Sequence, residues 1–270
     1  MTELPVALVT GGGRGVGRAI ALALGASGHA VGIVARSELE LEATRAQLER
    51  QGTRASASVA DVVDLAAVER AVRTTEDELG PVSVLVNNAG TSAAIGPAWV
   101  VDPEVWWGDI ESSLKGTFNA CRVVVPGMIA RNEGRIVNLS SYAAVRPAPY
   151  QTGYAAAKAA MASFSEGLAD SLIAHSVRVF TVTPGFVQTA MTELLTESDD
   201  GRRWLPELQE REPLDLESVA QLVVFLAAGG GDRLSGRFLH ALDDVRELLA
   251  RIDEIERDDL YAIRLRRLPG

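Results

Sequence analysis

A tyrosine and a lysine four residues apart, Tyr154 and Lys158, have types and spacing suited to proton transfer. In a helix this spacing places both side chains on one face. An ammonium group beside a phenol stabilises the ionised phenol, so we expect Lys158 to lower the pKa of Tyr154 from its reference value of about 10. A phenol tuned in this way is a usable general acid or base. The spacing alone is common, and an ordinary surface pair on a helix is the alternative interpretation.

A glycine-rich segment, TGGGRGVG at residues 10–17, lies directly between the apolar run VALV and the helical run RAIALALGASG. Glycines permit a tight turn and a close approach of the backbone to a pyrophosphate, which then binds at the start of the following helix. The spacing is G-x-x-x-G-x-G, with Gly11, Gly15 and Gly17 at the three key positions. In this context the segment predicts dinucleotide binding, and a turn that binds no ligand is the alternative.

The residues after the second apolar run indicate which dinucleotide is bound. A protein that holds the ribose 2′-hydroxyl of NAD is expected to present Asp or Glu there, whereas this chain presents Ala35, Arg36 and Ser37. Arg36 can pair with a 2′-phosphate, Ser37 can donate to it, and Arg14 supplies a second positive charge. The pattern favours NADP(H) over NAD(H). The alternative is that Arg36 is a solvated residue at the start of a helix, or that Glu38 engages it.

Short apolar runs that alternate with longer segments of helical periodicity indicate βαβ units. The runs lie at residues 6–9, 30–34, 55–59, 82–86, 135–139 and 177–182. Such a pattern predicts an α/β fold: a Rossmann-type doubly wound parallel sheet, in three layers, which binds ligands at the carboxyl edge of its strands. We expect a single NADP-binding catalytic domain over residues 1–242.

Residues 243–270 are expected to form a C-terminal amphipathic extension. Apolar side chains repeat there at helical spacing, at Val245, Leu248, Leu249, Ile252 and Ile255, which predicts one helix from about 243 to 257, followed by LYAIRLRRLPG. The apolar stripe requires a cover. The domain itself, a second subunit and the mouth of the active site remain open alternatives.

Composition excludes several classes of function. A formal net charge of −10, without a cluster of Lys or Arg, argues against nucleic-acid binding. No apolar run reaches the 18 or so residues of a membrane span, and no basic leader precedes the first strand, so we expect neither insertion nor secretion. Cys121 is the single cysteine, which suits a cytoplasmic protein. The three histidines lack metal-ligand spacing, so we expect no metal.

Taken together, these motifs resemble the shorter branch of the short-chain dehydrogenase/reductase family, in particular its carbonyl and 3-ketoacyl reductases. The resemblance covers roughly residues 4 to 242. It rests on TGGGRGVG, Asp61-Val62, NNAG at residues 87–90, GRIVNLSS, YAAAK with Ser141 thirteen residues before Tyr154, and PGFVQT at residues 184–189.

The resemblance implies an NADP(H)-dependent oxidoreductase that interconverts a ketone and a secondary alcohol. Tyr154 would move the hydroxyl proton, Ser141 would hydrogen-bond the substrate oxygen, and Lys158 would hold the nicotinamide ribose. The implied cofactor-binding residues are Gly11, Arg14, Gly15, Val16, Gly17, Arg36, Ser37, Asp61, Val62, Asn88, Ala89, Gly90, Lys158, Pro184, Gly185, Val187 and Thr189. Asp61 and Val62 would frame the adenine, and Val187 and Thr189 would hold the carboxamide of the nicotinamide.

The chain departs from the family pattern at Ser113, where the family usually has an Asn that anchors a water chain from the catalytic lysine. A Ser hydroxyl is shorter and has fewer donors than an amide, so the proton relay is expected to be rearranged; Asn119 is a weaker candidate for the missing amide. In the substrate loops, Phe186, Met191, Trp204 and Tyr150 are expected to form an apolar lid over a hydrophobic or aromatic carbonyl compound.

Two other functions remain open. An NAD-dependent alcohol dehydrogenase would work in the oxidative direction, and Ala35 and Arg36 oppose it. A catalytically silent NADP-binding module is supported by Ser113 and the unusual C-terminal extension. The resemblance further implies a small-molecule carbonyl or alcohol substrate and a homodimer or homotetramer.

Overall fold

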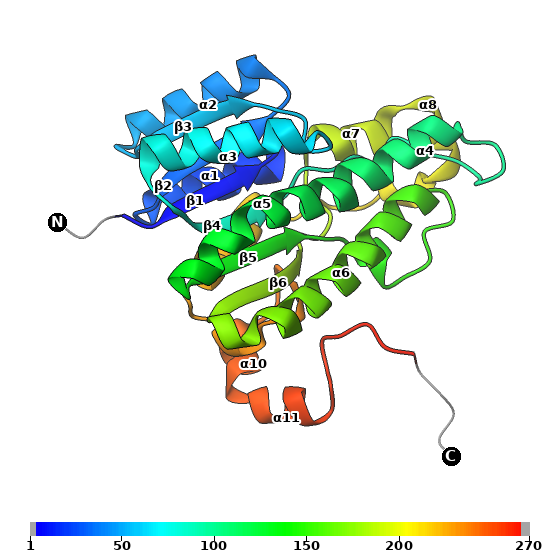
Figure 1. Ribbon diagram of the computed structural model, residues 1–270. Coiled ribbons are helices and arrows are strands. Elements are labelled where there is room, and N and C mark those ends of the chain that lie inside the picture. Colours follow the sequence, from blue (N-terminus) through cyan, green and yellow to red (C-terminus); the bar gives the residue numbers. More distant parts are fainter. Residues whose placement is uncertain (1–3, 266–270) are drawn as a thin grey trace.

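The computed structural model describes residues 4–265, and this part of the chain contains a parallel sheet of seven strands in the order β3-β2-β1-β4-β5-β6-β7 (Figure 1). The strands are β1 (Val6–Thr10), β2 (Ala30–Ala35), β3 (Ala55–Val59), β4 (Val82–Asn87), β5 (Gly134–Leu139), β6 (Val177–Thr183) and β7 (Phe238–His240). Each of the six predicted strands is present and begins and ends within one residue of its prediction.

Helices cover both faces of the sheet, which confirms the three-layer Rossmann-type fold (Figure 1). The α-helices are α1 (Gly15–Ala26), α2 (Glu38–Arg50), α3 (Leu65–Leu79), α4 (Pro103–Ile110), α5 (Gly116–Arg131), α6 (Thr152–Leu172), α7 (Ala190–Glu197), α8 (Asp199–Trp204), α9 (Leu216–Ala227), α10 (Val245–Ala250) and α11 (Ile252–Arg257). One buried apolar cluster joins α1, α2 and α9 to the sheet. A second joins α3, α5 and α6 to its other face.

Polar caps fix where several helices begin, and so fix the loops that leave the sheet. The Ser37 hydroxyl accepts from the Glu40 amide at 3.3 Å and caps α2. The Asp64 carboxylate accepts from the amides of Ala66 and Ala67 and caps α3. Such caps satisfy amides that would otherwise lack a partner in the first helical turn.

The strand order reverses between β1 and β4, whose last residues, Thr10 and Asn87, pair across the sheet. The chain runs from β1 outward through β2 to β3, and then returns to the other side of β1 with β4. In doubly wound sheets a crevice opens at such a point, beyond the carboxyl ends of the strands. The glycine-rich segment follows β1, and NNAG spans the end of β4, so the topology brings both motifs to this crevice.

The C-terminal extension differs from its prediction, because the chain forms two short helices, α10 and α11, that meet at Arg251 in place of one helix over 243–257. Their buried side chains Leu248, Ile252 and Ile255 belong to the apolar cluster of α1, α2 and α9. The sequence leaves three covers for the apolar stripe open, and for these side chains the structure shows that the cover is the domain itself. The last five residues of LYAIRLRRLPG lie outside the described residues.

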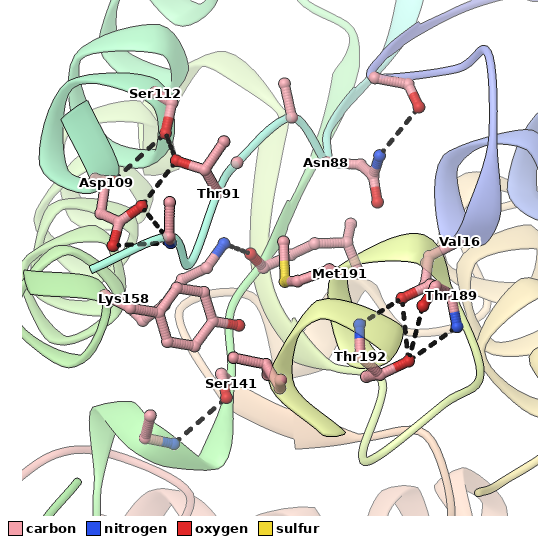
Figure 2. Close-up of a pocket in the computed structure, with 18 of the residues that line it drawn as sticks. Val16, Asn88, Thr91, Asp109, Ser112, Ser141, Lys158, Thr189, Met191 and Thr192 are labelled. Carbon is pink, nitrogen blue, oxygen red and sulfur yellow. Dashed lines mark hydrogen bonds between the residues drawn. The ribbon is translucent and has the colours of Figure 1, made fainter. Parts of the chain in front are cut away.

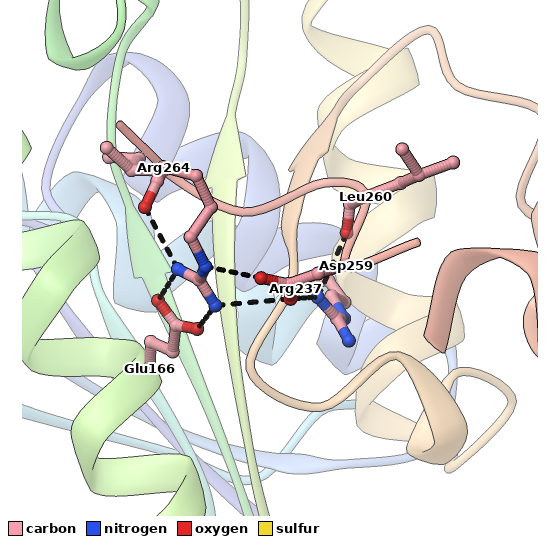
Figure 3. Close-up of polar contacts among 6 residues, drawn as sticks. Glu166, Arg237, Asp259, Leu260 and Arg264 are labelled. Atoms are coloured by element: carbon pink, nitrogen blue, oxygen red, sulfur yellow. Dashed lines mark hydrogen bonds and ion pairs between the residues drawn. The ribbon is translucent and has the colours of Figure 1, made fainter. Parts of the chain in front are cut away.

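Beyond α11 the chain lies against the end of the sheet through polar contacts (Figure 3). The Phe238 amide of β7 donates to the Tyr261 carbonyl at 2.7 Å. Arg237 forms an ion pair with Asp259 at 2.7 Å, and Arg264 bridges Asp259 and Glu166 of α6. This segment is therefore tied both to the edge strand β7 and to α6.

Among residues 4–265, no helix is long and apolar enough to cross a bilayer.

Candidate active site

A cavity of about 1120 Å³ opens at the carboxyl edge of the sheet, where the crevice was expected. Its walls come from the segments after β1, β2, β3, β4, β5 and β6. All the residues predicted from the sequence as catalytic or cofactor-binding line this cavity, except two glycines. Gly15 and Gly17 belong to the glycine-rich loop but do not line the cavity.

Gly17 allows the glycine-rich loop to close on itself. A Cβ atom at this position would lie 2.2 Å from the Gly11 carbonyl oxygen, a distance that no side chain tolerates. Asn88 then joins the loop to β4, because its side-chain amide donates to the carbonyls of Thr10 at 3.1 Å and Gly11 at 3.2 Å. The amide of Asn88 and that of Ala89 both donate to the Thr10 hydroxyl. The cradle predicted for a pyrophosphate is thus built by the end of β4 as much as by glycines.

The end of β2 carries the groups predicted to read the 2′ position of a ribose. Arg36 and Ser37 line the cavity, and Arg36 has no hydrogen bond or ion pair with another residue in the range 4–265, so Glu38 does not engage it. Arg14 is less available than expected, because its guanidinium pairs with Glu40 at 3.2 Å. Arg36 is therefore the principal cation at this end.

Two further predicted residues shape the same end of the cavity. The Asp61 carboxylate accepts from the Val63 amide at 3.0 Å and fixes the turn after β3. Val62 is buried, and a Cβ atom at Gly116 would meet it at 2.5 Å. Asn119 donates to the carbonyls of Val62 and Val63 at 2.9 and 3.1 Å. Its amide thus supports the turn, so it does not replace the family Asn in a proton relay.

Tyr154 and Lys158 lie on α6, and Ser141 follows β5, so three separate signals in the sequence meet in one cavity. Figure 2 shows Lys158 and Ser141 there. The Lys158 amine is buried, donates to the Leu139 carbonyl at 2.6 Å, and lies 5.6 Å from the centre of the Tyr154 ring. The Ser141 hydroxyl accepts from the Ala143 amide at 3.2 Å, which caps a short 3-10 helix, η2 (Tyr142–Ala144). Ser141 keeps its own proton to donate.

Burial changes the acidity of the two titratable groups in opposite senses. It raises the pKa of Tyr154, and interaction with the Ser141 hydroxyl offsets only part of that rise. It lowers the pKa of Lys158 to about 8. Burial disfavours whichever form is charged. The expectation that Lys158 lowers the pKa of Tyr154 is therefore wrong for this structure, in which desolvation dominates.

Ser113 lies in a single turn of π-helix, η1 (Glu111–Lys115), between α4 and α5. Its hydroxyl is fully buried and has no hydrogen-bond partner in the described part of the chain. It faces Gly90, because a Cβ atom on that glycine would lie 2.8 Å from the Ser113 Oγ and 3.5 Å from the Lys158 Nζ. The position is thus close to Lys158, but no hydrogen bond joins the two side chains.

Sequence reasoning missed Asp109, a fully buried carboxylate in the wall of the cavity. It accepts from the Thr91 hydroxyl at 2.8 Å and from the amides of Ala93 and Ala94 at 2.9 and 3.0 Å (Figure 2). Its negative charge contributes to the raised pKa of Tyr154. An acidic residue in the otherwise apolar segment VWWGDI was the available signal, since charges are rarely buried without partners.

The predicted apolar lid divides into two parts. Phe186 and Met191 line the cavity, whereas Tyr150 and Trp204 do not. These two rings stack on each other, with centroids 5.1 Å apart, in an apolar cluster with Ile95. Tyr150 and Trp204 pack behind residues that line the cavity, so the prediction that these two rings cover a substrate is wrong.

His240 of β7 also escaped the sequence analysis. Its ring packs on Tyr142, with centroids 4.9 Å apart, and its Nδ1 accepts from the Leu242 amide at 3.0 Å. The same ring is close to Gly185, because a Cβ atom on Gly185 would lie 3.2 Å from the His240 Nε2. The last strand thereby braces both Tyr142 and the Pro184-Gly185 turn.

A doubly wound sheet with a glycine-rich loop, and a Ser, Tyr and Lys beside it in one cavity, defines a dinucleotide-binding oxidoreductase of the Rossmann type. The family model for short chain dehydrogenases matches residues 5–200. The chain belongs to this family, and it is an oxidoreductase that acts on CH–OH or keto groups.

Individual relatives show the same kinship over most of the chain. The 3-oxoacyl-[acyl-carrier-protein] reductase of Haemophilus influenzae is 33% identical over 235 residues, which are 87% of this chain and 95% of the relative. The short-chain reductase protein NovJ of Streptomyces niveus is 38% identical over 89% of this chain and 93% of its own length. A gluconate 5-dehydrogenase from Burkholderia cenocepacia, solved in complex with NADP and tartrate, superposes with a TM-score of 0.79 at 28% identity, covering 88% of this chain and 93% of that one.

Proposed function

We propose that the protein is an NADPH-dependent reductase that converts a ketone into a secondary alcohol. The observation that carries the proposal is the placement of Arg36 at one end of the cavity that holds Ser141, Tyr154 and Lys158. The relatives from Haemophilus influenzae and Streptomyces niveus bear the names of reductases, and the dehydrogenase from Burkholderia cenocepacia was solved with NADP. These names support the same direction and the same cofactor.

The residues present fit such a cofactor. Gly17 and Gly11 leave space where side chains would block the loop, and the start of α1 presents its amides beside that space. At the other end Arg36 would pair with the 2′-phosphate, and the Ser37 hydroxyl, whose oxygen accepts from Glu40, would still donate its proton to it. Asp61 and Val62 would frame the adenine. Lys158, Val187 and Thr189 would hold the nicotinamide end.

The acidity of Tyr154 favours reduction over oxidation. When bound, the reduced nicotinamide supplies the hydride. Negative charge then develops on the carbonyl oxygen, where the hydroxyls of Ser141 and Tyr154 can both donate. A phenol of ordinary acidity is protonated at neutral pH, and burial, which raises the pKa of Tyr154, keeps it so; the hydroxyl can therefore donate its proton. In the oxidative direction the same phenol would have to lose its proton first.

The affinity for NADPH and NADH, followed by fluorescence titration, tests the proposal. We expect NADPH to bind at least about tenfold more tightly than NADH, because only NADPH has a 2′-phosphate with which Arg36 can form a charge-assisted hydrogen bond. Arg36→Ala should remove most of the difference. Arg50→Ala, at the end of the helix α2 that follows Arg36 and outside the cavity, is the matched control and should leave the difference unchanged.

Two outcomes would replace the proposal. Equal or tighter binding of NADH would make the NAD-linked oxidation of an alcohol the better assignment. Tight NADPH binding with no turnover of any ketone would make the protein a silent NADP-binding module.

We also propose that the protein forms a homodimer or homotetramer. Phe118 and Ile129 are exposed on α5, eleven residues apart. Eleven residues are close to three turns of an α-helix, so these two side chains fall on nearly the same face. Light scattering coupled to size-exclusion chromatography measures the mass directly, and a monomer at micromolar concentration would contradict the proposal.

A further inference from the structure

Two arginines line the cavity at the end opposite Arg36. Arg146 follows β5, and Arg211 lies on the segment before α9. The strand order β3-β2-β1-β4-β5-β6 places the end of β2, with Arg36, on one side of the crevice and the ends of β5 and β6 on the other. The pair therefore lies on the substrate side, beyond the residues that fit the cofactor.

Aromatic rings of the cavity wall position both guanidinium groups. Arg146 lies over the ring of Tyr142, 5.2 Å from its centre, and Arg211 lies over the ring of Phe186 at 5.8 Å. Tyr142 directly follows Ser141 in the chain. Stacking of this kind orients an arginine while its N–H groups stay free to donate.

The segment that carries Arg211 is itself anchored to the wall. The Leu214 amide donates to the Phe186 carbonyl at 2.6 Å, and Leu214 pairs with Val187 as an isolated bridge. A backbone link so close to Phe186 holds Arg211 beside the turn that follows β6.

Neither arginine has a carboxylate partner within residues 4–265, although the chain carries a net charge of −10. The carboxylates on this side of the cavity are directed elsewhere. Asp109 accepts from Thr91 and two backbone amides, and Glu111 pairs with Lys115 at 3.1 Å. Glu207 also lines the cavity but forms no ion pair with either arginine.

We infer that Arg146 and Arg211 select a ketone that carries a negatively charged group, a phosphate or a carboxylate, which they hold while the carbonyl faces Ser141 and Tyr154. The inference rests on the proposed reductase function and adds the substrate class to it. Neither arginine forms an ion pair with a carboxylate of the described residues that line the cavity, so both guanidinium groups are available to a negative group on the substrate. The apolar side chains Phe186 and Met191 would contact the carbon chain between the charge and the carbonyl.

The test compares charged ketones with neutral counterparts in the Arg146→Gln, Arg211→Gln and doubly substituted proteins. Acetoacetyl-CoA, which carries phosphates, is paired with the neutral acetoacetyl thioester of N-acetylcysteamine. The carboxylate 4-oxopentanoate is paired with its methyl ester. For each pair we compare kcat/KM for the charged ketone with kcat/KM for the neutral one. We expect the double substitution to lower this ratio about tenfold in one of the two pairs, because it removes hydrogen bonds between the arginines and the charged group. The pair that responds identifies phosphate or carboxylate.

A matched control separates this role from a general loss of an arginine. Arg203 lies over the ring of Trp204 at 4.6 Å, in the same kind of contact, but does not line the cavity. Arg203→Gln should leave both ratios within about twofold of wild type.

The inference is overturned if the ratios stay unchanged in the double variant, or if charged and neutral ketones lose activity by the same factor. A tenfold loss of NADPH affinity in the double variant also overturns it, because the arginines would then hold the cofactor. If the wild-type protein reduces none of the four ketones, the proposed function fails on its own. The inference is then decided by calorimetric titration of acetoacetyl-CoA and 4-oxopentanoate into the NADPH-saturated protein, where equal affinities for wild type and double variant would reject it.

Discussion

The buried amine of Lys158 donates to the backbone carbonyl of Leu139, at 2.6 Å, and so the lysine is held by the last residue of β5. In the described part of the chain, no carboxylate forms an ion pair with the Lys158 amine and so balances its charge. Desolvation therefore determines its acidity, and the pKa falls to about 8. The amine is close to changing its charge under ordinary assay conditions.

This acidity predicts how the free energy of unfolding depends on pH. The pKa of Lys158 is about 8 in the folded protein and 10.5 in the reference state, so between these values the unfolded chain holds a proton that the folded chain has lost. Unfolding then takes up a proton, and stability rises with pH across this window, by about 3 kcal/mol for this group. Urea denaturation of wild type and Lys158→Met at pH 7.5, 9 and 10.5 measures the contribution. A difference between the two proteins that stays constant with pH would show that the folded-state pKa is not lowered.

Tyr154→Phe removes the proposed proton donor without changing the shape of the cavity. We expect kcat to fall by about 10²- to 10⁴-fold, because general acid catalysis contributes on this scale. The affinity for NADPH should stay within about twofold, since the phenol is not part of the cofactor cradle. Tyr150→Phe is the control, because Tyr150 packs on Trp204 behind the wall. A wild-type kcat in the Tyr154→Phe enzyme would show that another group donates the proton.

Ser113→Ala tests whether the buried hydroxyl beside Gly90 takes part in a relay. Because this hydroxyl lacks a partner, its removal should leave the unfolding free energy unchanged or raise it by about 1 kcal/mol. Thr117→Val, which deletes a hydroxyl that donates to the Ser113 carbonyl at 2.7 Å, should instead cost about 1 kcal/mol. We expect kcat of Ser113→Ala within about twofold of wild type. A tenfold loss of kcat would mean that the hydroxyl holds a water on the path to Lys158.

The C-terminal extension should stabilise the fold through its buried side chains more than through its ion pairs. Ile255 is 2% exposed within the cluster of α1, α2 and α9, and Ile255→Ala should lower the unfolding free energy by about 2 to 5 kcal/mol. Arg264→Gln, which removes exposed ion pairs to Glu166 and Asp259, should cost about 1 kcal/mol or less. Chemical denaturation of both variants gives the comparison, and equal losses would contradict it.

The sheet and the proposed site could be predicted from sequence where the information is local. Strands buried on both faces appear as apolar runs, and Tyr154 and Lys158 lie one helical turn apart. The glycine-rich segment is placed by the strand before it and the helix after it. Each of these signals lies within a few residues, and the topology of parallel sheets brings them to a common edge.

The rest depends on contacts between distant segments. The roles of Asp109 and Asn88 come from backbone groups that only the folded chain brings to them. The acidity of Tyr154 follows from burial, which its spacing to Lys158 does not reveal. The break at Arg251 interrupts a periodic apolar pattern that would equally fit one helix. Periodicity identifies the buried face of a segment but not where its hydrogen bonds stop.

The link between Phe238 and Tyr261 also bears on how the protein avoids strand pairing between the sheet edges of two molecules. An edge strand with free backbone groups can pair with the edge of another molecule, and β7 stands at the end of the sheet. Because the chain after α11 occupies the Phe238 amide, and Arg237 is engaged by Asp259, this edge offers an incoming strand less to pair with. A chain cut after residue 242 would lose that cover, and we expect it to aggregate on heating at temperatures where the full chain refolds.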